Sequence, residues 1–524
     1  MAYFTGNKLP VMIRSLKILA LLASPLTLFS QQAEMPPRME STNQPARFGP
    51  LRFREDSVTI IGEYKNFTGG PPFKVAVSEW ISNNQATYSA PIDSNGHFRL
   101  TFPMPAPGEI HIDFGRASLW NVAIPGETMY LSADMNKIEG PKRGDTAAIT
   151  AWKEHTATIF EGSNARLHND IYRYWRHQAA SSNQTGYGSR QWNEQFKLDA
   201  FCDTVHGIFR SRMQFLQDYH RRTPLEARAL QFIETTLRYS NASVLTQRYY
   251  YVLWNDRVKH EKRYFATIDS IVRPVLTTGY LAMDYRTVLR DIHSHISTKA
   301  LNLPGSNIDS LHNEYILHPV ERSLTQAWLA SIIQRQGHVL DDSMMTALRA
   351  SVKEPYLIKQ LTQRNDALKA LQADNALLAG ARLITEFPEL KTSAEIYRHI
   401  TAPYRGKVIY LDIWGTWCIP CREAMQHMPP VKEQYAGKDV VFLYLANRSP
   451  MEAWKNTIKQ HRITGANVVH YNLPAAMQQL FEKDYLDEGF PTYMLIDKEG
   501  KLVTQKAPRP HHTAELITAI NKLL

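Results

Sequence analysis

Two cysteines three residues apart, Cys418 and Cys421, stand between an apolar run and a stretch with helical periodicity. The run over 407–414 has the length and composition of a buried strand, and the chain after Cys421 continues as a helix to about residue 435. Further segments alternate in the same way, with strands predicted over 440–445, 489–497 and 501–504 and helices over 450–461 and from about 511. This alternation predicts an α/β domain over residues 390–524.

The position of the cysteine pair suits thiol–disulfide exchange. The thiolate is the nucleophile in this chemistry, and the free N–H groups at a helix N-terminus would stabilise a Cys418 thiolate. Cys421, one helical turn later, would reach the first sulfur and resolve a mixed disulfide. Pro420 falls in the first turn, where a missing N–H costs nothing. Trp417, with Trp414, would give a substrate an apolar platform, so the pattern predicts a redox-active site.

Other uses of a C-x-x-C pair are weaker hypotheses. A zinc site needs two more ligands at close spacing, and the sequence has no second C-x-x-C or nearby Cys/His pair. Haem c attachment needs His directly after the second cysteine, where this chain has Arg422. A purely structural disulfide stays open, although a bridge across one helical turn constrains little chain. We therefore expect no metal and no cofactor.

Asp412 is the polar residue within the apolar run over 407–414. Burial would raise the pKa of its carboxyl group, and this would suit it to move a proton to or from Cys421. An ordinary turn residue at the end of the strand is the alternative.

These residues resemble the thioredoxin superfamily, and within it the exported TlpA-type disulfide reductases, including the ResA group. The resemblance rests on Trp414-Gly-Thr-Trp-Cys-Ile-Pro-Cys-Arg422, on Leu411-Asp412 before it and on Gly489-Phe-Pro-Thr492 after it. It implies a thioredoxin-like fold for the C-terminal part of the chain. It also implies that Cys418 attacks, that Cys421 resolves, and that the two form a disulfide when oxidised.

The same resemblance implies further site residues. Asp412 takes the place of the family's buried acid, and Pro491 that of a cis-proline that faces the cysteines. Phe490 would offer backbone groups to an extended substrate strand, and we expect Trp417 and Pro420 to contact the same substrate.

The rest of the chain is too long for one hydrophobic core, since the protein has 524 residues. Residues 51–140 contain short alternating runs separated by turns, which predicts a small antiparallel β-sandwich-like domain. Residues 145–385 have apolar residues at three- and four-residue spacing, which predicts an all-α region. Cys202 lies in this region and is expected to be a buried, small hydrophobic residue.

Residues 1–30 have the pattern of a secretory signal peptide. Arg14 and Lys17 precede an apolar run over 18–29, which is short for a membrane span. Polar, proline-bearing residues 31–50 are predicted to form a linker. We therefore expect export to the periplasm or cell envelope, with an uncleaved anchor or a buried strand as the alternative for the apolar run.

The leading hypothesis is an exported thiol–disulfide oxidoreductase that reduces protein disulfides. Its expected partners are substrate proteins with disulfides and a membrane thiol donor that re-reduces the cysteine pair. An oxidase or isomerase with the same residues is one alternative, because Ala424 and Gln426 stand where the resembled family has Glu and Pro. Another is a binding or scaffold protein whose residues 51–390 engage a partner and whose redox domain is regulatory. The net charge of +10 is scattered without a long basic run, so we expect no nucleic-acid partner.

Overall fold

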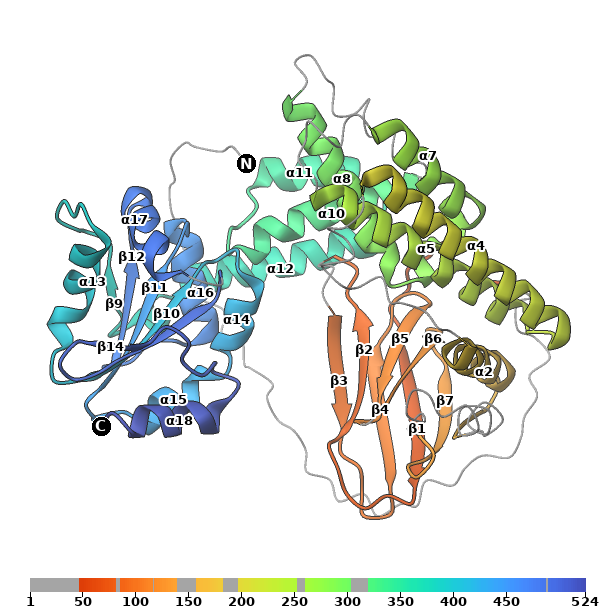
Figure 1. Cartoon of the computed structure of the whole chain (residues 1–524), viewed down its shortest axis with the longest axis horizontal. Helices are drawn as coiled ribbons and strands as arrows, with labels where there is room; N and C mark the ends of the chain where they lie inside the picture. Colours follow the sequence, from red (N-terminus) through yellow and green to blue (C-terminus); the bar gives the residue numbers. More distant parts are fainter. Residues whose placement is uncertain are drawn as a thin grey trace. The chain divides into compact units, whose positions relative to one another are not determined.

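The chain passes from strands through helices to a mixed α/β part (Figure 1). This order confirms the predicted fold class, but residues 145–385 are not all helical, because strand β8 (Thr158–Glu161) lies among them and pairs with the first part. The computed structural model describes residues 47–81, 85–115, 117–138, 157–181, 197–251, 260–302, 319–486 and 489–524. The predicted signal peptide and most of the predicted linker lie outside these residues. Within the described ranges, no helix has the length and apolar character needed to cross a membrane.

Two four-stranded sheets form the first part, in the orders β4-β1-β7-β8 and β3-β2-β5-β6. Val58 and Ile60 of β1 illustrate the alternation, since every second residue of that strand is buried in the core between the sheets. One pairing departs from the antiparallel expectation, because β1 and β7 run parallel. Parallel neighbours need a crossover, and the intervening strands supply it. The strands are β1 (Ser57–Lys65), β2 (Phe73–Ser78), β3 (Gln85–Ala90), β4 (His97–Pro103), β5 (Gly108–Asp113), β6 (Ser118–Ala123), β7 (Thr128–Asp134) and β8 (Thr158–Glu161).

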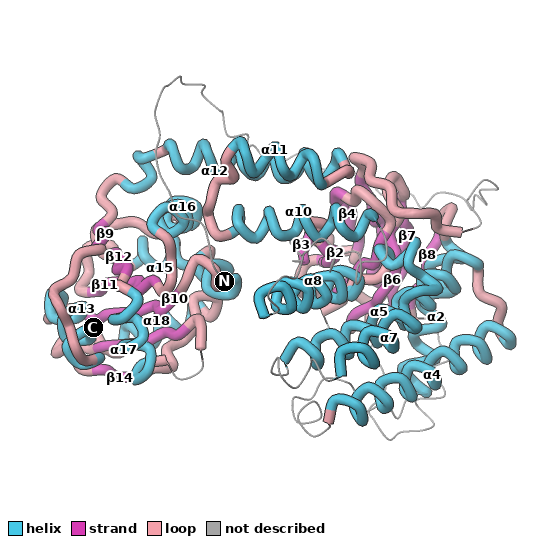
Figure 2. The backbone as a smooth tube through the Cα atoms, turned by 90° about the horizontal axis from the view of Figure 1, so that it is seen from above, coloured by secondary structure: helices cyan, strands magenta, loops and turns pink. Residues whose placement is uncertain are grey.

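The second part is helical, and α5 packs against α4, α7 and α8 (Figure 2). Fully buried tyrosines, among them Tyr174, Tyr239 and Tyr264, fill its core. Cys202 is buried in the same core. The elements are α2 (Ala165–Ser181), α4 (Leu198–Arg222), α5 (Ala227–Tyr251), α7 (Glu261–Val272), η2 (Arg273–Leu281), α8 (Asp284–Asn302), α10 (Pro319–Arg335), α11 (Asp342–Ser351), α12 (Pro355–Ala373) and η3 (Asn375–Leu378).

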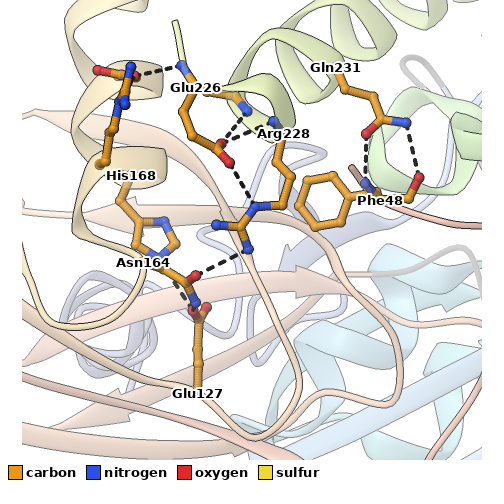
Figure 3. Close-up of polar contacts among 10 residues, drawn as sticks. Phe48, Glu127, Asn164, His168, Glu226, Arg228 and Gln231 are labelled. Atoms are coloured by element: carbon orange, nitrogen blue, oxygen red, sulfur yellow. Dashed lines mark hydrogen bonds and ion pairs between the residues drawn. The ribbon is translucent and has the colours of Figure 1, made fainter. Parts of the chain in front are cut away.

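A polar network joins the strands to the helices (Figure 3). Glu127 lies before β7, and its Oε2 accepts hydrogen bonds from Asn164 Nδ2 at 2.6 Å and from His168 Nε2 at 3.3 Å. Arg228 of α5 donates to Asn164 Oδ1 at 3.2 Å and to Glu226 Oε1 at 3.0 Å. Each of these buried charges therefore has a partner, as burial requires.

The third part is a six-stranded sheet in the order β14-β13-β10-β11-β12-β9. Strands β10, β11, β12 and β9 are parallel, and β13 and β14 are antiparallel additions at one edge. All seven residues of β10 are buried, because separate hydrophobic cores cover the two faces of the sheet. The elements are β9 (Arg382–Ile384), α13 (Ser393–Thr401), η4 (Ala402–Tyr404), β10 (Val408–Trp414), α14 (Ile419–Met425), α15 (Met428–Gln434), β11 (Val440–Ala446), α16 (Met451–His461), β12 (Val468–Asn472), α17 (Ala475–Tyr485), β13 (Thr492–Ile496), β14 (Leu502–Thr504) and α18 (Thr513–Asn521).

Two details of this third part differ from the sequence-based expectation. Strand β9 precedes residue 390, where we predict the domain to begin, so the sheet starts earlier. The single helix predicted after Cys421 is wrong, since the chain forms α14 and then α15. Pro429 and Pro430 lack the N–H groups that would continue the first helix, and both are tolerated in the first turn of the second.

Buried polar side chains of α16 bind backbone carbonyls of the helical part. Asn456 Nδ2 donates to the carbonyl of Gly337 at 2.8 Å. Lys459 Nζ donates to the carbonyls of Leu371 at 3.1 Å and Gln372 at 2.9 Å. The C-terminal carbonyls of α12 therefore receive an ammonium group, which also suits the negative end of the helix dipole.

Candidate redox site

Cys418 and Cys421 are joined by a disulfide at the junction between β10 and α14. Cys418 is the N-cap residue of α14, and its Sγ accepts a hydrogen bond from the Cys421 backbone N–H at 3.2 Å. Both side chains are buried, with exposed fractions of 4% and 0%. The helix begins here because Pro420 supplies a preset φ angle in the first turn. In the reduced protein, the same N–H group would face a Cys418 thiolate.

A second loop, at the carboxyl end of β11, supports the turn before Cys418. Ser449 Oγ accepts from the Thr416 backbone N–H at 3.0 Å and donates to the Asn447 carbonyl at 2.8 Å. That carbonyl also accepts from Trp417 Nε1 at 3.3 Å. A Cβ added at Gly415 would come within 2.5 Å of Trp417 Nε1, so the ring can occupy this place only beside glycine.

Asp412 lies on β10 among aromatic neighbours, with 1% of its surface exposed. In the sheet register it stands opposite Tyr444 on β11 and Tyr493 on β13. Alternation along β10 puts it on the face that carries Tyr410 and Trp414, whose core also contains both cysteines. Neither carboxyl oxygen has a hydrogen-bond partner among the described residues. Burial therefore raises the pKa of Asp412 well above its usual range.

Trp417 and Phe490 form an apolar surface beside the disulfide. Their rings meet edge to face with centroids 4.9 Å apart, and 38% of Trp417 is exposed. The Arg448 guanidinium lies over the Trp417 ring, 5.4 Å from its centroid. The peptide bond between Phe490 and Pro491 is cis, and Pro420 is exposed.

The structure thus adds Asn447, Arg448 and Ser449 to the residues expected from the sequence. The sequence contains one indication of their position, because these three residues follow the strand predicted over 440–445. The carboxyl ends of adjacent parallel strands lie at one edge of a sheet, and here Trp414 pairs with Ala446. The sequence alone does not say which two strands are adjacent.

A metal site is not evident in the described part of the chain. No group of three or more His, Cys, Asp or Glu side chains among those residues could hold a metal ion.

Comparison with known proteins agrees with this geometry. Residues 406–502 match a family model described as thioredoxin-like. Over 104 residues the chain is 33% identical to the thiol-disulfide oxidoreductase ResA of Bacillus thuringiensis subsp. konkukian (strain 97-27), a match that covers 20% of this chain and 56% of that protein. Over 97 residues it is 27% identical to the thioredoxin-like protein YneN of Bacillus subtilis (strain 168), covering 18% and 54% respectively.

The chain spans about half the length of these curated relatives. A crystal structure of the thioredoxin domain of a thiol-disulfide oxidoreductase from Bacteroides vulgatus is 24% identical. That match covers 23% of this chain and 81% of the other with a TM-score of 0.20. The family match and the ResA similarity confirm the predicted resemblance. The C-terminal part of this protein is thus a thioredoxin-like domain with homologues among the ResA-type thiol-disulfide oxidoreductases.

Proposed function

We propose that this protein is an exported thiol–disulfide oxidoreductase that reduces disulfides of other proteins through Cys418 and Cys421. The observation that carries the proposal is the cysteine pair at the start of α14, on the same side of the sheet as the buried Asp412. The similarity of residues 406–502 to relatives named thiol-disulfide oxidoreductases supports it.

The reaction moves two electrons from the cysteine pair to the substrate. The Cys418 thiolate attacks one sulfur of the substrate disulfide, which forms a mixed disulfide and releases the first substrate thiolate. Cys421 then loses its proton and attacks the Cys418 sulfur. The Cys418–Cys421 disulfide forms, the mixed disulfide breaks, and the second substrate thiolate leaves. Protons from the two cysteine thiols neutralise the two products.

Asp412 is proposed to take the proton from Cys421. A carboxyl group with a raised pKa is a better proton acceptor near neutral pH than an ordinary aspartate, once it is ionised. Its burial on the side of the sheet that carries the cysteines supports this role.

The surface formed by Trp417, Phe490 and Pro491 is proposed to receive the substrate. An extended strand placed there would find apolar contacts from both rings and backbone groups from Phe490. The exposed Pro420 lies in the first turn of α14 and would contact the same strand.

The direction of electron transfer is part of the proposal. A reductase in an oxidising compartment needs a thiol donor, which we propose to be a membrane protein. The reduction potential of the pair, measured by equilibration of the full chain with dithiothreitol or glutathione, tests this direction. A value near that of thioredoxin, about −270 mV, supports a reductase, whereas a value near that of DsbA, about −120 mV, makes the protein an oxidant.

The Cys421→Ser variant tests the order of the two cysteines. Without the resolving thiol, the variant is expected to accumulate a mixed disulfide through Cys418, visible as a mass increase after incubation with a disulfide-bonded peptide. The Cys418→Ser variant should give no such adduct. The opposite pattern would exchange the two roles.

A further inference from the structure

A cavity of about 690 Å³ lies between the sandwich and the helices. Strands β5 and β6 form one wall, and α2, α4 and α5 form the other. The described residues that line it fall between 109 and 284, so it is separate from the redox site. A volume of this size fits a small organic molecule.

Aromatic side chains make up much of the cavity wall. Phe114 and Trp120 come from the β5–β6 side, and Tyr172 and Trp175 come from α2. Trp120 is one of the exposed large hydrophobic residues of the protein, with an exposed fraction of 39%. The faces of such rings attract both apolar groups and cations.

Several polar atoms of the wall are buried without a hydrogen-bond partner in the described part of the chain. They are Thr158 Oγ1, Thr236 Oγ1 and Trp175 Nε1, and Thr158 is completely inaccessible. Burial of a polar atom without a partner is unfavourable, so these three atoms lower the stability of the wall around the cavity.

Two carboxyl groups line the same cavity. Glu109 of β5 has an exposed fraction of 9%, and its Oε2 accepts from the Met283 backbone N–H at 2.8 Å. Asp284, the first residue of α8, is close enough to act on it electrostatically. Burial, with the charge of Asp284, raises the pKa of Glu109 to about 8 in spite of the nearby Arg286. Arg286 itself donates to the Glu79 carbonyl at 2.6 Å and lies over the Trp80 ring.

Two arginines also line the cavity, and both have partners within the protein. Arg176 Nη1 donates to Tyr172 OH at 2.6 Å, and its guanidinium lies over the Tyr172 ring. Arg212 is likewise not free. The two acids repel each other when charged, so an ammonium placed between them is favoured, although Asp284 is also hydrogen-bonded to Ser243.

We propose that this cavity binds an organic amine, with the ammonium group at Glu109 and Asp284 and the apolar body against the aromatic wall. The ammonium would neutralise the two carboxylates, which both line the cavity. This proposal is independent of the redox chemistry, and it gives the sandwich and helices a ligand-binding role.

Binding should release a proton, because Glu109 has to ionise to pair with the ammonium. Below a pH of about 8 the carboxyl group is mostly protonated in the empty cavity, so amine affinity should fall as the pH is lowered. The charged groups that face Glu109 or line the cavity are Asp284, Arg286, Arg176 and Arg212.

Isothermal titration of the full chain with three probes of one shape tests the proposal. The probes are 2-phenylethylamine, 2-phenylethanol and 3-phenylpropanoate, titrated at pH 8.5. The amine is expected to bind roughly tenfold more tightly than the alcohol, and the carboxylate more weakly than both. Titration in two buffers of different ionisation enthalpy, repeated at pH 7, should reveal the released proton.

Variants then locate the ammonium. Glu109→Gln keeps the acceptor for the Met283 N–H and should remove the preference for the amine over the alcohol, and Asp284→Asn should reduce it. Glu161→Gln, an exposed glutamate of β8, is the matched control and should change nothing. The proposal is overturned if none of the probes binds, if the carboxylate binds most tightly, or if both variants keep the amine preference.

Discussion

At the scale of single residues, the environment of the Asp412 carboxyl group is unusual. Both of its oxygens are buried without a partner in the described part of the chain, and Tyr444 and Tyr493 flank it without satisfying it. An unpaired buried carboxyl group destabilises a fold. Residues that lower stability in this way are typical of functional sites, where chemistry requires them.

We expect Asp412→Asn to raise the stability of the protein and to lower its activity. The raised pKa means that the carboxyl group holds its proton in the folded state at pH values where the unfolded chain has lost it. The contribution of Asp412 to the free energy of unfolding therefore falls as the pH rises above the ordinary pKa of an aspartate. At pH 8 the variant should therefore unfold at a higher urea concentration than the unaltered protein. Its free energy of unfolding should rise by more than the roughly 0.5 kcal/mol by which a surface substitution usually changes it.

The same variant should lose turnover on the order of a hundredfold at neutral pH, because Cys421 would have no proton acceptor. The deficit should shrink as the pH rises and the thiol ionises unaided. A deficit that stays constant across the pH profile would exclude a role of Asp412 in proton transfer.

A second residue-scale prediction concerns His470 of β12. This ring is completely buried, Nε2 lies 2.6 Å from the Ile463 carbonyl, and burial lowers the pKa of His470 to about 4. The unfolded chain binds a proton at this residue below its ordinary value of 6.5, and the folded chain does not until about 4. His470 therefore contributes its full share to the free energy of unfolding above pH 6.5. About 3 kcal/mol of that free energy is lost as the pH falls towards 4.

Urea unfolding at pH 7.5 and pH 5 measures the first part of this loss, about 2 kcal/mol. His470→Gln should be less sensitive to pH than the unaltered protein, whereas the exposed control His512→Gln should show the full sensitivity. Equal sensitivity in all three proteins would assign the acid destabilisation to other groups.

At the scale of elements, the site is a junction between two loops at one edge of the sheet. The turn from β10 to α14 carries Cys418, and the loop after β11 holds that turn through Ser449 and Asn447. Gly415 is the point of closest approach between them, since a Cβ there would lie 3.0 Å from the Asn447 carbonyl. The position of Cys418 therefore depends on a glycine and on a neighbouring loop.

Gly415→Ala should accordingly displace Trp417 from the Asn447 carbonyl. We expect a loss of about 1–3 kcal/mol in stability and a loss of activity on protein substrates, since part of the apolar surface moves. The matched control is Gly207→Ala in α4, where a Cβ meets nothing within 4 Å. That change should stabilise the protein by about 0.5–1 kcal/mol and leave activity unaltered.

At the scale of the whole molecule, the sandwich and the helices are connected by charges as well as by apolar contacts. The side chain of Arg228 is only 5% exposed and donates hydrogen bonds to both Glu226 and Asn164. Asn164 donates a further hydrogen bond to Glu127 (Figure 3). Removal of one member leaves the others buried without partners. Such networks are therefore costly to break, even where their net contribution to stability is small.

Arg228→Ala is expected to lower the free energy of unfolding by about 3–5 kcal/mol. Arg221→Ala breaks an exposed pair with Asp218 and should change it by less than about 1 kcal/mol. Thermal unfolding followed by circular dichroism compares the two variants. Similar losses in both would mean that the network is not the connection between these parts.

The sequence predicts the centre of the third part better than its edges. The apolar run before Cys418 predicts β10 because a strand buried on both faces is apolar throughout. Strand β9 is not predicted, since it has three residues and none of them is buried. The break after Met425 was visible in Pro429 and Pro430, but the apolar spacing favoured one helix. The contacts of Asp412 and of Ser449 depend on strand order, which no local pattern contains.

The roles of Cys418, Cys421, Asp412, Pro491 and the substrate surface remain predictions for these experiments to test. In the same way, the cavity at Glu109 could not be predicted from the sequence, because its walls come from β5, β6, α2, α4, α5 and α8. Residues this far apart in the chain meet only through tertiary packing.

The hydrogen bonds between Lys459 and the end of α12 determine which fragments of this protein can be compared with the full chain. A chain shortened to residues 390–524 would keep the buried lysine and discard the two carbonyls that accept its protons. It would also lose strand β9 from the edge of the sheet. Such a fragment would be weakened for reasons unrelated to substrate recruitment. A comparison of fragment and full chain would therefore confuse fragility with function, and only point variants in the intact protein keep the two apart.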